Sequence, residues 1–343
     1  MNYAAITGMD CELPRKIISN EELMQRFPNG NMESFLKVIG IQQRHACEEG
    51  ETAGDLGFLA ADRLLTRMGI DRSSIDGLTF ATLSPDYISP TTSSVLQHRL
   101  GLGKNVCTFD IMQACPGFVH HMATVNGLIS TGACKRILAI NADTPSKLIH
   151  PKDGALLPIH GDGAVAMIVE RQELSTPFFN WYTFGTDGSQ RDRIIIPMGM
   201  ARQPYDASKI VEEIDAAGNV RTNKETKMDG AAVFHFVIHV IPKFIKESMA
   251  QHNETIEDYD LILLHQANKM MVEMLYKMLK VPAEKQFAYM ENVGNLGGTS
   301  IPMVLLQAIR AGRCKPGSRV LMCAFGAGLT WAATSLTVGE INV

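Results

Sequence analysis

The chain lacks several features that would indicate particular classes of protein. It has no uninterrupted apolar run long enough to span a bilayer, and its N-terminus has no basic stretch followed by an apolar one. Its seven cysteines form no CxxC pair, which argues against a disulfide framework or a zinc site. Its net charge of −4 gives no polyanion-binding signal. These absences predict a cytoplasmic protein with reduced thiols that binds neither nucleic acid nor a membrane.

The sequence that is present has the composition of an ordinary soluble enzyme. Its 343 residues are 45% hydrophobic and 20% charged. Apolar strand patterns alternate with amphipathic helical patterns, which predicts layers of α-helix and β-sheet. The predicted strands are Gly77–Leu83, Val106–Ile111, Arg136–Asn141, Ala164–Glu170, Leu261–Leu264, Phe287–Met290, Arg319–Ala324 and Ala332–Val338.

An internal duplication organises these elements. Gly132 follows Cys115 by 17 positions (132 − 115), and Gly312 follows Asn295 by the same number (312 − 295). Each pair sits in the same order of strand, turn, helix and strand, at an offset of 180 residues. The pattern predicts two related α/β halves, residues 1–175 and 176–343, whose strand ends converge on one central site.

Cys115 lies where the pattern changes from strand to helix. The apolar run Val106–Ile111 precedes it, and Pro116 is expected in the first turn of a helix that continues to about residue 130. The free N–H groups and the positive dipole end of a helix N-terminus favour an anion, so this position predicts a nucleophilic thiolate. Taken alone, the turn fits a buried structural cysteine equally well.

Two polar residues are the best partners for such a cysteine. His265 directly follows the buried strand Leu261–Leu264, and Asn295 lies in a glycine-rich turn. Side chains at the carboxyl ends of strands face the ligand crevice of an α/β sheet. As single residues, both also fit structural roles, as a core histidine and a turn asparagine. His160 precedes the segment Gly161-Asp-Gly-Ala164, so we expect it to support a tight turn in the core.

Five motifs together resemble one family. In chain order they are Gln113-Ala-Cys-Pro-Gly-Phe118, Gly161-Asp-Gly-Ala164, His265-Gln-Ala-Asn268, Gly294-Asn-Leu-Gly-Gly-Thr-Ser300 and Ala324-Phe-Gly-Ala-Gly-Leu-Thr-Trp331. With this set, the chain resembles the β-ketoacyl-acyl-carrier-protein synthase III group of the thiolase superfamily, nearly from end to end. Each motif alone is weak, whereas the five in this order are specific.

The resemblance implies a homodimer with the five-layered αβαβα thiolase fold, and no metal or redox cofactor. Cys115 would take an acyl group from a thioester. The N–H groups of Cys115 and Ala327 would form the oxyanion hole. His265 and Asn295 would bind the thioester carbonyl of a malonyl-carrier extender, and the enolate formed by decarboxylation would attack the acyl-cysteine.

The resemblance also implies contacts with substrates and partners. Substrate-binding roles are expected for Asn268, Gly230, Ser89 and Phe325. The helix after His265 carries Lys269 and Lys277, which are expected to dock an acidic acyl carrier protein. An ordinary solvated helix face would show the same charges.

Two departures from the family pattern bear on the acyl donor and the primer. Relatives that use coenzyme A thioesters carry a Trp and an Arg where this chain has Ser34 and Val38. An acyl-carrier-protein donor, or another thioester, is therefore favoured over acyl-coenzyme A. The gate of the primer pocket, aromatic in acetyl-specific relatives, aligns with Ser89, so we predict that primers longer than acetyl are accepted.

The leading functional prediction is a decarboxylative Claisen condensation in fatty acid or related lipid biosynthesis. The alternative is an acyltransferase that uses the same acyl-cysteine to form an ester, an amide or a carbon–carbon bond in a secondary-metabolite pathway. A thiolase would need a second reactive cysteine in a Cys-x-Gly setting, which Cys323-Ala-Phe does not supply. A non-catalytic subunit of this superfamily would typically lack Cys115.

Overall fold

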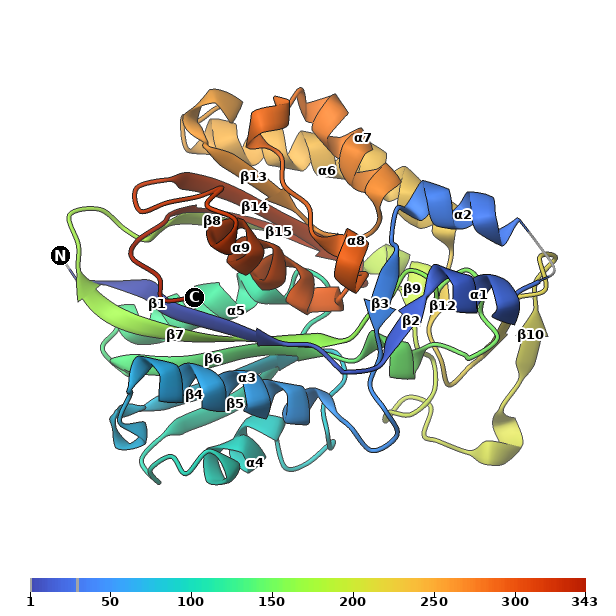
Figure 1. The fold of residues 1–343 in the computed structure, drawn as a ribbon, viewed down its shortest axis with the longest axis horizontal. Helices are drawn as coiled ribbons and strands as arrows, with labels where there is room; N and C mark the ends of the chain where they lie inside the picture. The colour runs from blue at the N-terminus through green and yellow to red at the C-terminus, as the bar shows by residue number, and fades with distance from the viewer. Residues whose placement is uncertain (1, 29–30) are drawn as a thin grey trace.

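Two β-sheets form the framework of the molecule (Figure 1). The computed structural model describes residues 2–28 and 31–343. The first sheet has five strands in the order β1-β7-β6-β4-β5, which are Asn2–Glu12, Gly163–Glu173, Arg136–Asp143, Gly77–Thr82 and Cys107–Met112. Strand β4 runs parallel to β5 and β6, whereas β7 runs antiparallel to β6 and β1.

The second sheet repeats this arrangement. Its strands lie in the order β13-β14-β15-β8, which are Leu261–Leu264, Arg319–Gly326, Thr330–Thr337 and Phe179–Thr186. Strand β13 is parallel to β14, and β15 is antiparallel to β14 and β8. Strands β13, β14, β15 and β8 therefore correspond to β4, β6, β7 and β1 of the first sheet, in that order. The two pseudo-repeated halves of the predicted fold are therefore confirmed.

The repeat is incomplete at the position of β5. There, the described part of the second half has only one parallel bridge, between Gln286 and Ile262. The strand predicted at Phe287–Met290 is wrong, because Met290 begins the short helix α8 (Met290–Val293). The other seven predicted strands correspond to β4, β5, β6, β7, β13, β14 and β15.

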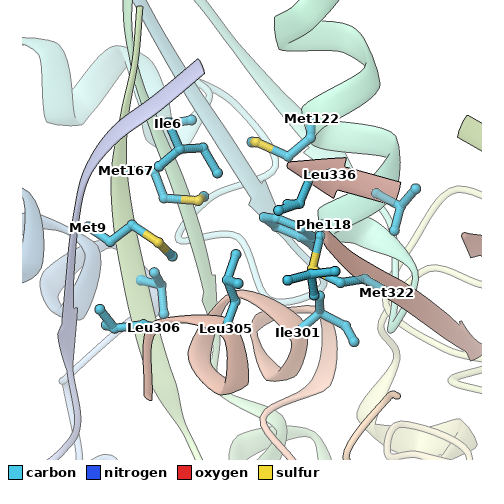
Figure 2. Packing of buried hydrophobic residues seen from close by; sticks show 14 of the residues in the cluster. Ile6, Met9, Phe118, Met122, Met167, Ile301, Leu305, Leu306, Met322 and Leu336 are labelled. Carbon is cyan, nitrogen blue, oxygen red and sulfur yellow. The ribbon is translucent and has the colours of Figure 1, made fainter. Parts of the chain in front are cut away.

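Helices α5 (Gly117–Ser130) and α9 (Ser300–Arg310) lie between the two sheets and pack on strands of both. Figure 2 shows Phe118 of α5 and Leu305 of α9 among side chains from the sheets, such as Met167 of β7. All three side chains are fully buried. Burial of one such side chain contributes roughly 1.5–3 kcal/mol, so this layer holds the two halves together.

Two outer layers of helices complete the fold. Helices α3 (Ala53–Met68) and α4 (Thr92–Arg99) cover the outer face of the first sheet. Helices α6 (Gly230–Gln251) and α7 (Lys269–Leu279) cover that of the second sheet. The resulting order of helix, sheet, helix, sheet and helix confirms the predicted five-layered αβαβα architecture.

The N-terminal elements lie outside this simple division into halves. Strand β2 (Ile17–Ser19), helices α1 (Asn20–Arg26) and α2 (Met32–Ile39), and β3 (Gln43–His45) pack on the side of α6 and α7 (Figure 1). Arg44 of β3 anchors them. Its side chain is fully buried, and its guanidinium donates to the backbone carbonyls of Pro158, Ile18 and Ile41.

The remaining elements are short. Strands β9, β10, β11 and β12 lie between β8 and α6 and span Ile194–Ile195, Glu212–Ile214, Val220–Thr222 and Lys227–Met228. The predicted boundary between residues 175 and 176 lies between β7 and β8 and stays a prediction. In the described ranges, no helix has both the length and the apolar character needed to cross a membrane.

Candidate active site

Cys115 lies in the turn between β5 and α5, where the sequence places it. The helix begins at Gly117 and Pro116 is its N-cap residue, one position outside the predicted first turn. Cys115 lines a cavity of about 130 Å³ at the carboxyl ends of strands from both sheets. His265 and Asn295 line the same cavity. The structure therefore brings together the three residues predicted to be catalytic.

The glycine-rich loop after β14 lies directly against the cysteine. A methyl group on Gly326 would lie 2.6 Å from the sulfur of Cys115, so only glycine allows this approach. The next residue, Ala327, also lines the cavity. Within residues 31–343, no backbone oxygen accepts a hydrogen bond from the N–H of Ala327. Ala327 thus has a free N–H group in the wall of the cavity that Cys115 lines, and its predicted place in an oxyanion hole stays a prediction.

His265 follows β13 directly. Its backbone N–H donates to the carbonyl of Cys323 at 2.9 Å, and the ring of Phe325 packs edge-on against its imidazole, with 5.4 Å between ring centroids. Burial and then the neighbouring His160 lower the pKa of His265 to about 3. The imidazole is therefore neutral at physiological pH, and its Nδ1 is buried without a protein partner.

Asn295 is fixed by the turn around it. Its backbone pairs with that of His160 in a parallel bridge, in which the N–H of Gly161 donates to the Asn295 carbonyl at 3.1 Å. The side-chain Oδ1 of Asn295 accepts from the N–H of Gly297 at 3.0 Å and from the hydroxyl of Ser300 at 3.2 Å. Because the amide oxygen is held by the protein, the NH2 group is what Asn295 can offer to a ligand.

The structure places His160 in the cavity rather than in a supporting turn. Residues paired in a bridge point to the same side, so the side chains of His160 and Asn295 lie next to each other. Sequence reasoning missed this residue because its functional neighbour lies 135 positions away (295 − 160). The only local signal was its place before Gly161, which a structural turn explains equally well.

Asp143, the last residue of β6, is a second residue that the sequence did not single out. Its carboxylate is 1% exposed and accepts hydrogen bonds from the N–H of Leu83 at 2.7 Å and from the N–H and hydroxyl of Thr299, both at 3.2 Å. Burial raises the pKa of Asp143 to about 6 despite these bonds. The carboxylate joins the loop after β4 to the turn that holds Asn295.

The surroundings of Cys115 oppose the thiolate that the sequence predicts, which stays a prediction. Burial and then the charge of Asp143 raise the pKa of Cys115 to about 12, opposed by its own N–H group. Both effects favour the neutral thiol, so a group that takes its proton would assist the attack of the sulfur.

The residues predicted to bind substrate divide into two groups. Asn268 and Phe325 line the cavity, and Asn268 also caps α7, with its Oδ1 accepting from the N–H of Met271 at 2.9 Å. Gly230 and Ser89 do not line it. Gly230 is the exposed first residue of α6, and Ser89 is exposed in the loop between β4 and α4.

The two predicted docking lysines, Lys269 and Lys277, are exposed at opposite ends of α7. Lys269 comes directly after Asn268 of the cavity, and its Nζ lies 3.8 Å from the carboxylate of Glu273. The helix therefore presents positive charge close to the site.

The remaining wall of the cavity is mainly apolar and includes Leu148, Ile149, Leu156, Ile159, Ile194, Met228, Val233 and Phe236. A second hollow of about 670 Å³ adjoins it and shares Leu83, Leu148, Ile194, Thr226 and Ala327. Among the described residues, no three His, Cys, Asp or Glu side chains are grouped as a metal site. The arrangement suits an acyl chain attached to Cys115, with polar groups concentrated at one end.

Comparison with known proteins agrees with this geometry. Residues 109–188 match the family model for 3-oxoacyl-[acyl-carrier-protein] synthase III, and residues 249–338 match the model for its C-terminal part. A putative 3-oxoacyl-[acyl-carrier-protein] synthase 3 from Campylobacter jejuni is 33% identical over 342 residues, which cover 98% of this chain and 95% of that protein. The chain belongs to the 3-oxoacyl-acyl-carrier-protein synthase III family. It is thus an acyltransferase of the condensing-enzyme type.

Solved structures of this synthase III family share the whole fold. One crystal structure of a 3-oxoacyl-(acyl-carrier-protein) synthase III superposes with a TM-score of 0.94 at 33% identity, over 98% of this chain and 99% of that one. The enzyme from Burkholderia xenovorans gives a TM-score of 0.90 at 30% identity, over 100% and 97% of the two chains. OleA from Xanthomonas campestris, at 19% identity and a TM-score of 0.83, shares the fold alone.

Proposed function

We propose that this synthase III family member forms a carbon–carbon bond by decarboxylative Claisen condensation, in fatty acid or related lipid biosynthesis. Cys115 receives the acyl group of a thioester primer, and malonyl-acyl-carrier protein supplies the second substrate. The observation that carries the proposal is the convergence of Cys115, His265 and Asn295, from both halves of the chain, on one apolar cavity.

In the first half-reaction, the sulfur of Cys115 attacks the carbonyl carbon of the thioester. The carbonyl oxygen gains negative charge, which preorganised N–H groups stabilise. The free N–H of Ala327 and the N–H of Cys115, which already interacts with its own sulfur, are the proposed donors. The absence of a side chain on Gly326 leaves the space beside the sulfur that the carbonyl needs.

In the second half-reaction, loss of carbon dioxide from the malonyl group places negative charge on the thioester oxygen. The neutral imidazole of His265 and the free NH2 group of Asn295 are two uncharged donors for that oxygen. Hydrogen bonds from these two donors would stabilise the negative charge on the thioester oxygen as it develops in the transition state. Because decarboxylation supplies the driving force, the proposed reaction uses no metal or redox cofactor.

We propose an acyl-carrier-protein donor and a primer longer than acetyl. Ser34 and Val38 are exposed on α2 and offer neither an aromatic ring nor a cation to hold the adenine of coenzyme A. The apolar wall of the cavity and the adjoining hollow support a longer acyl chain. Lys269 and Lys277 on α7 support docking of an acidic carrier protein beside Asn268.

We propose that the protein is a cytoplasmic homodimer that pairs across β5. This strand is the edge of the first sheet, and Met112 at its end is 57% exposed. Ile88, in the loop after β4, is 81% exposed. An uncovered edge strand with large exposed apolar side chains is a pairing surface. Ser89 does not line the cavity of its own chain. It would therefore limit the length of a primer only in the cavity of a second subunit.

The direct test is acylation of the intact protein. Incubation with acyl-acyl-carrier protein or acyl-coenzyme A of increasing chain length should add one acyl mass to the protein and none to Cys115→Ala. Addition of malonyl-acyl-carrier protein should then release carbon dioxide and a 3-oxoacyl product. Turnover only with an alcohol or an amine selects the ester- or amide-forming alternative. If no thioester labels Cys115, both functions are wrong.

A further inference from the structure

The loading of Cys115 requires a group that accepts a proton. The thiol loses its proton as sulfur attacks the thioester, and the departing thiolate of the donor gains one. Burial and the charge of Asp143 raise the pKa of the Cys115 thiol, which favours its neutral form before the reaction. In cysteine acyl transfer, an adjacent base commonly takes this proton.

His160 lines the same cavity as Cys115 and has a ring nitrogen available as a base. Its Nδ1 pairs with the carbonyl of Leu156 at 2.9 Å, so Nδ1 carries the proton and Nε2 is left as an acceptor. Among the described residues, Nε2 of His160 has no protein partner. It is not one of the fully buried side-chain atoms that lack a partner there, which belong to Asn141 and His265. Nε2 is therefore accessible, and it opens to the cavity that His160 lines together with Cys115.

We propose that His160 is a catalytic residue of the loading step, whose Nε2 takes the proton of the Cys115 thiol and returns it to the leaving group. In R–CO–S–R′ + HS–Cys115 → R–CO–S–Cys115 + HS–R′, one thioester bond breaks and one forms. The proton moves from Cys115 sulfur to His160 and then to the sulfur of R′, and no further reactant is needed. The inference rests on the proposed acylation of Cys115.

The charges around His160 make it a better acceptor than its neighbours. The carboxylates of Asp162 and Asp153 and the carbonyl of Leu156 favour its protonated form, although burial lowers its pKa overall. His265 has no such support, since burial and His160 both disfavour its cation. The carboxylate of Asp143 is occupied by donors from two loops. A proton taken from the thiol is therefore best accommodated at His160.

Two substitutions separate proton transfer from packing and hydrogen bonding. His160→Phe keeps a ring of similar size but cannot bond or accept a proton. His160→Gln keeps a donor for the Leu156 carbonyl and an acceptor for the cavity, but cannot take up a proton. His98→Phe, an exposed position on α4 outside the cavity, is the matched control. Circular dichroism and thermal unfolding check that each variant folds.

The measurement is the single-turnover rate of Cys115 acylation by butyryl-acyl-carrier protein, followed by rapid quench and intact mass. General-base catalysis typically contributes about 10²–10⁴-fold, so both His160 variants should load that much more slowly at pH 7, and His98→Phe at the wild-type rate. Between about pH 7 and 9 the wild-type rate should stay level, since His160 is neutral there. The His160→Gln rate should rise about tenfold per pH unit as the thiol itself ionises.

The groups that face His160 and could alter this profile are Asp153 with its partner Arg221, Asp162, His265 and Cys115. Wild-type loading by His160→Gln, or a level profile for that variant, overturns the inference, because hydrogen bonding would then suffice. If His160→Phe fails to fold, the result for His160→Gln decides. A wild-type protein that no donor acylates refutes the proposed function instead, so the two failures are distinguishable.

Discussion

Replacing Gly326 by alanine should place a methyl group against the nucleophile. The added carbon would lie 2.6 Å from the sulfur and 2.8 Å from Cβ of Cys115. Such separations are much shorter than a carbon–sulfur or carbon–carbon van der Waals contact, which lies near 3.5–4.0 Å. Gly326 ends β14 and Cys115 precedes α5, so the clash cannot be relieved without moving the sulfur or an element of the fold.

The size of the effect follows from this overlap. An extra methyl group in a well-packed site typically costs about 1–3 kcal/mol. If the Cys115 side chain turns away to relieve the contact, that energy opposes the return of the sulfur to the attacking position. The loading rate then falls by roughly 5- to 150-fold. The thermal midpoint should change little, because the strain is relieved in the resting protein.

The assay is the single-turnover acylation of Cys115 by butyryl-acyl-carrier protein, together with thermal unfolding. Gly127→Ala is the matched control, because Gly127 lies inside α5 and a methyl group there would have no atom within 4 Å. This change should leave loading intact and stabilise the helix by up to about 1 kcal/mol. If Gly326→Ala loads at the wild-type rate, then the loop does not constrain the nucleophile as the structure indicates.

Three further predictions concern the site and its support. His265→Ala and Asn295→Ala should still load Cys115 but release carbon dioxide from malonyl-acyl-carrier protein roughly 10²–10³-fold more slowly; equal loss of loading would contradict their assignment to the second half-reaction. Asp143→Asn removes a charge that raises the pKa of Cys115, so the pH profile of alkylation by iodoacetamide should shift to lower pH, and a shift to higher pH would refute that electrostatic role. Arg44→Met removes the guanidinium that donates to the buried carbonyls of Pro158, Ile18 and Ile41, of which Ile41 keeps the amide of Asn20 as a donor, and should lower the free energy of unfolding in urea by about 1–3 kcal/mol; a loss below that range would show that water replaces the guanidinium.

Much of the fold could be read from local patterns. The strand at Leu261–Leu264 has the same bounds in the sequence prediction and in the structure, because a fully buried strand is a continuous apolar run. The strand predicted at Phe287–Met290 failed for a related reason. A short apolar run can form either a strand or a loop and helix that pack on a core. Which of the two forms depends on whether a neighbouring strand pairs with the run. Here, on the side of β13 away from β14, Gln286 alone forms a bridge among the described residues.

The sequence by itself determined the order of strands and helices, the duplicated turns and the identities of Cys115, His265 and Asn295. The order of elements and the duplicated turns depend on periodicity and on glycine positions, which are local properties of the chain, whereas the three residues were singled out by motifs that resemble one family. Only the tertiary structure decided that His160 lines the cavity, that Asp143 is bonded to the turn that holds Asn295, and that Ser89 lies outside the cavity. It also reversed the expected direction of the Cys115 pKa. Desolvation and contacts between distant segments set these properties, and neither can be read from the order of residues.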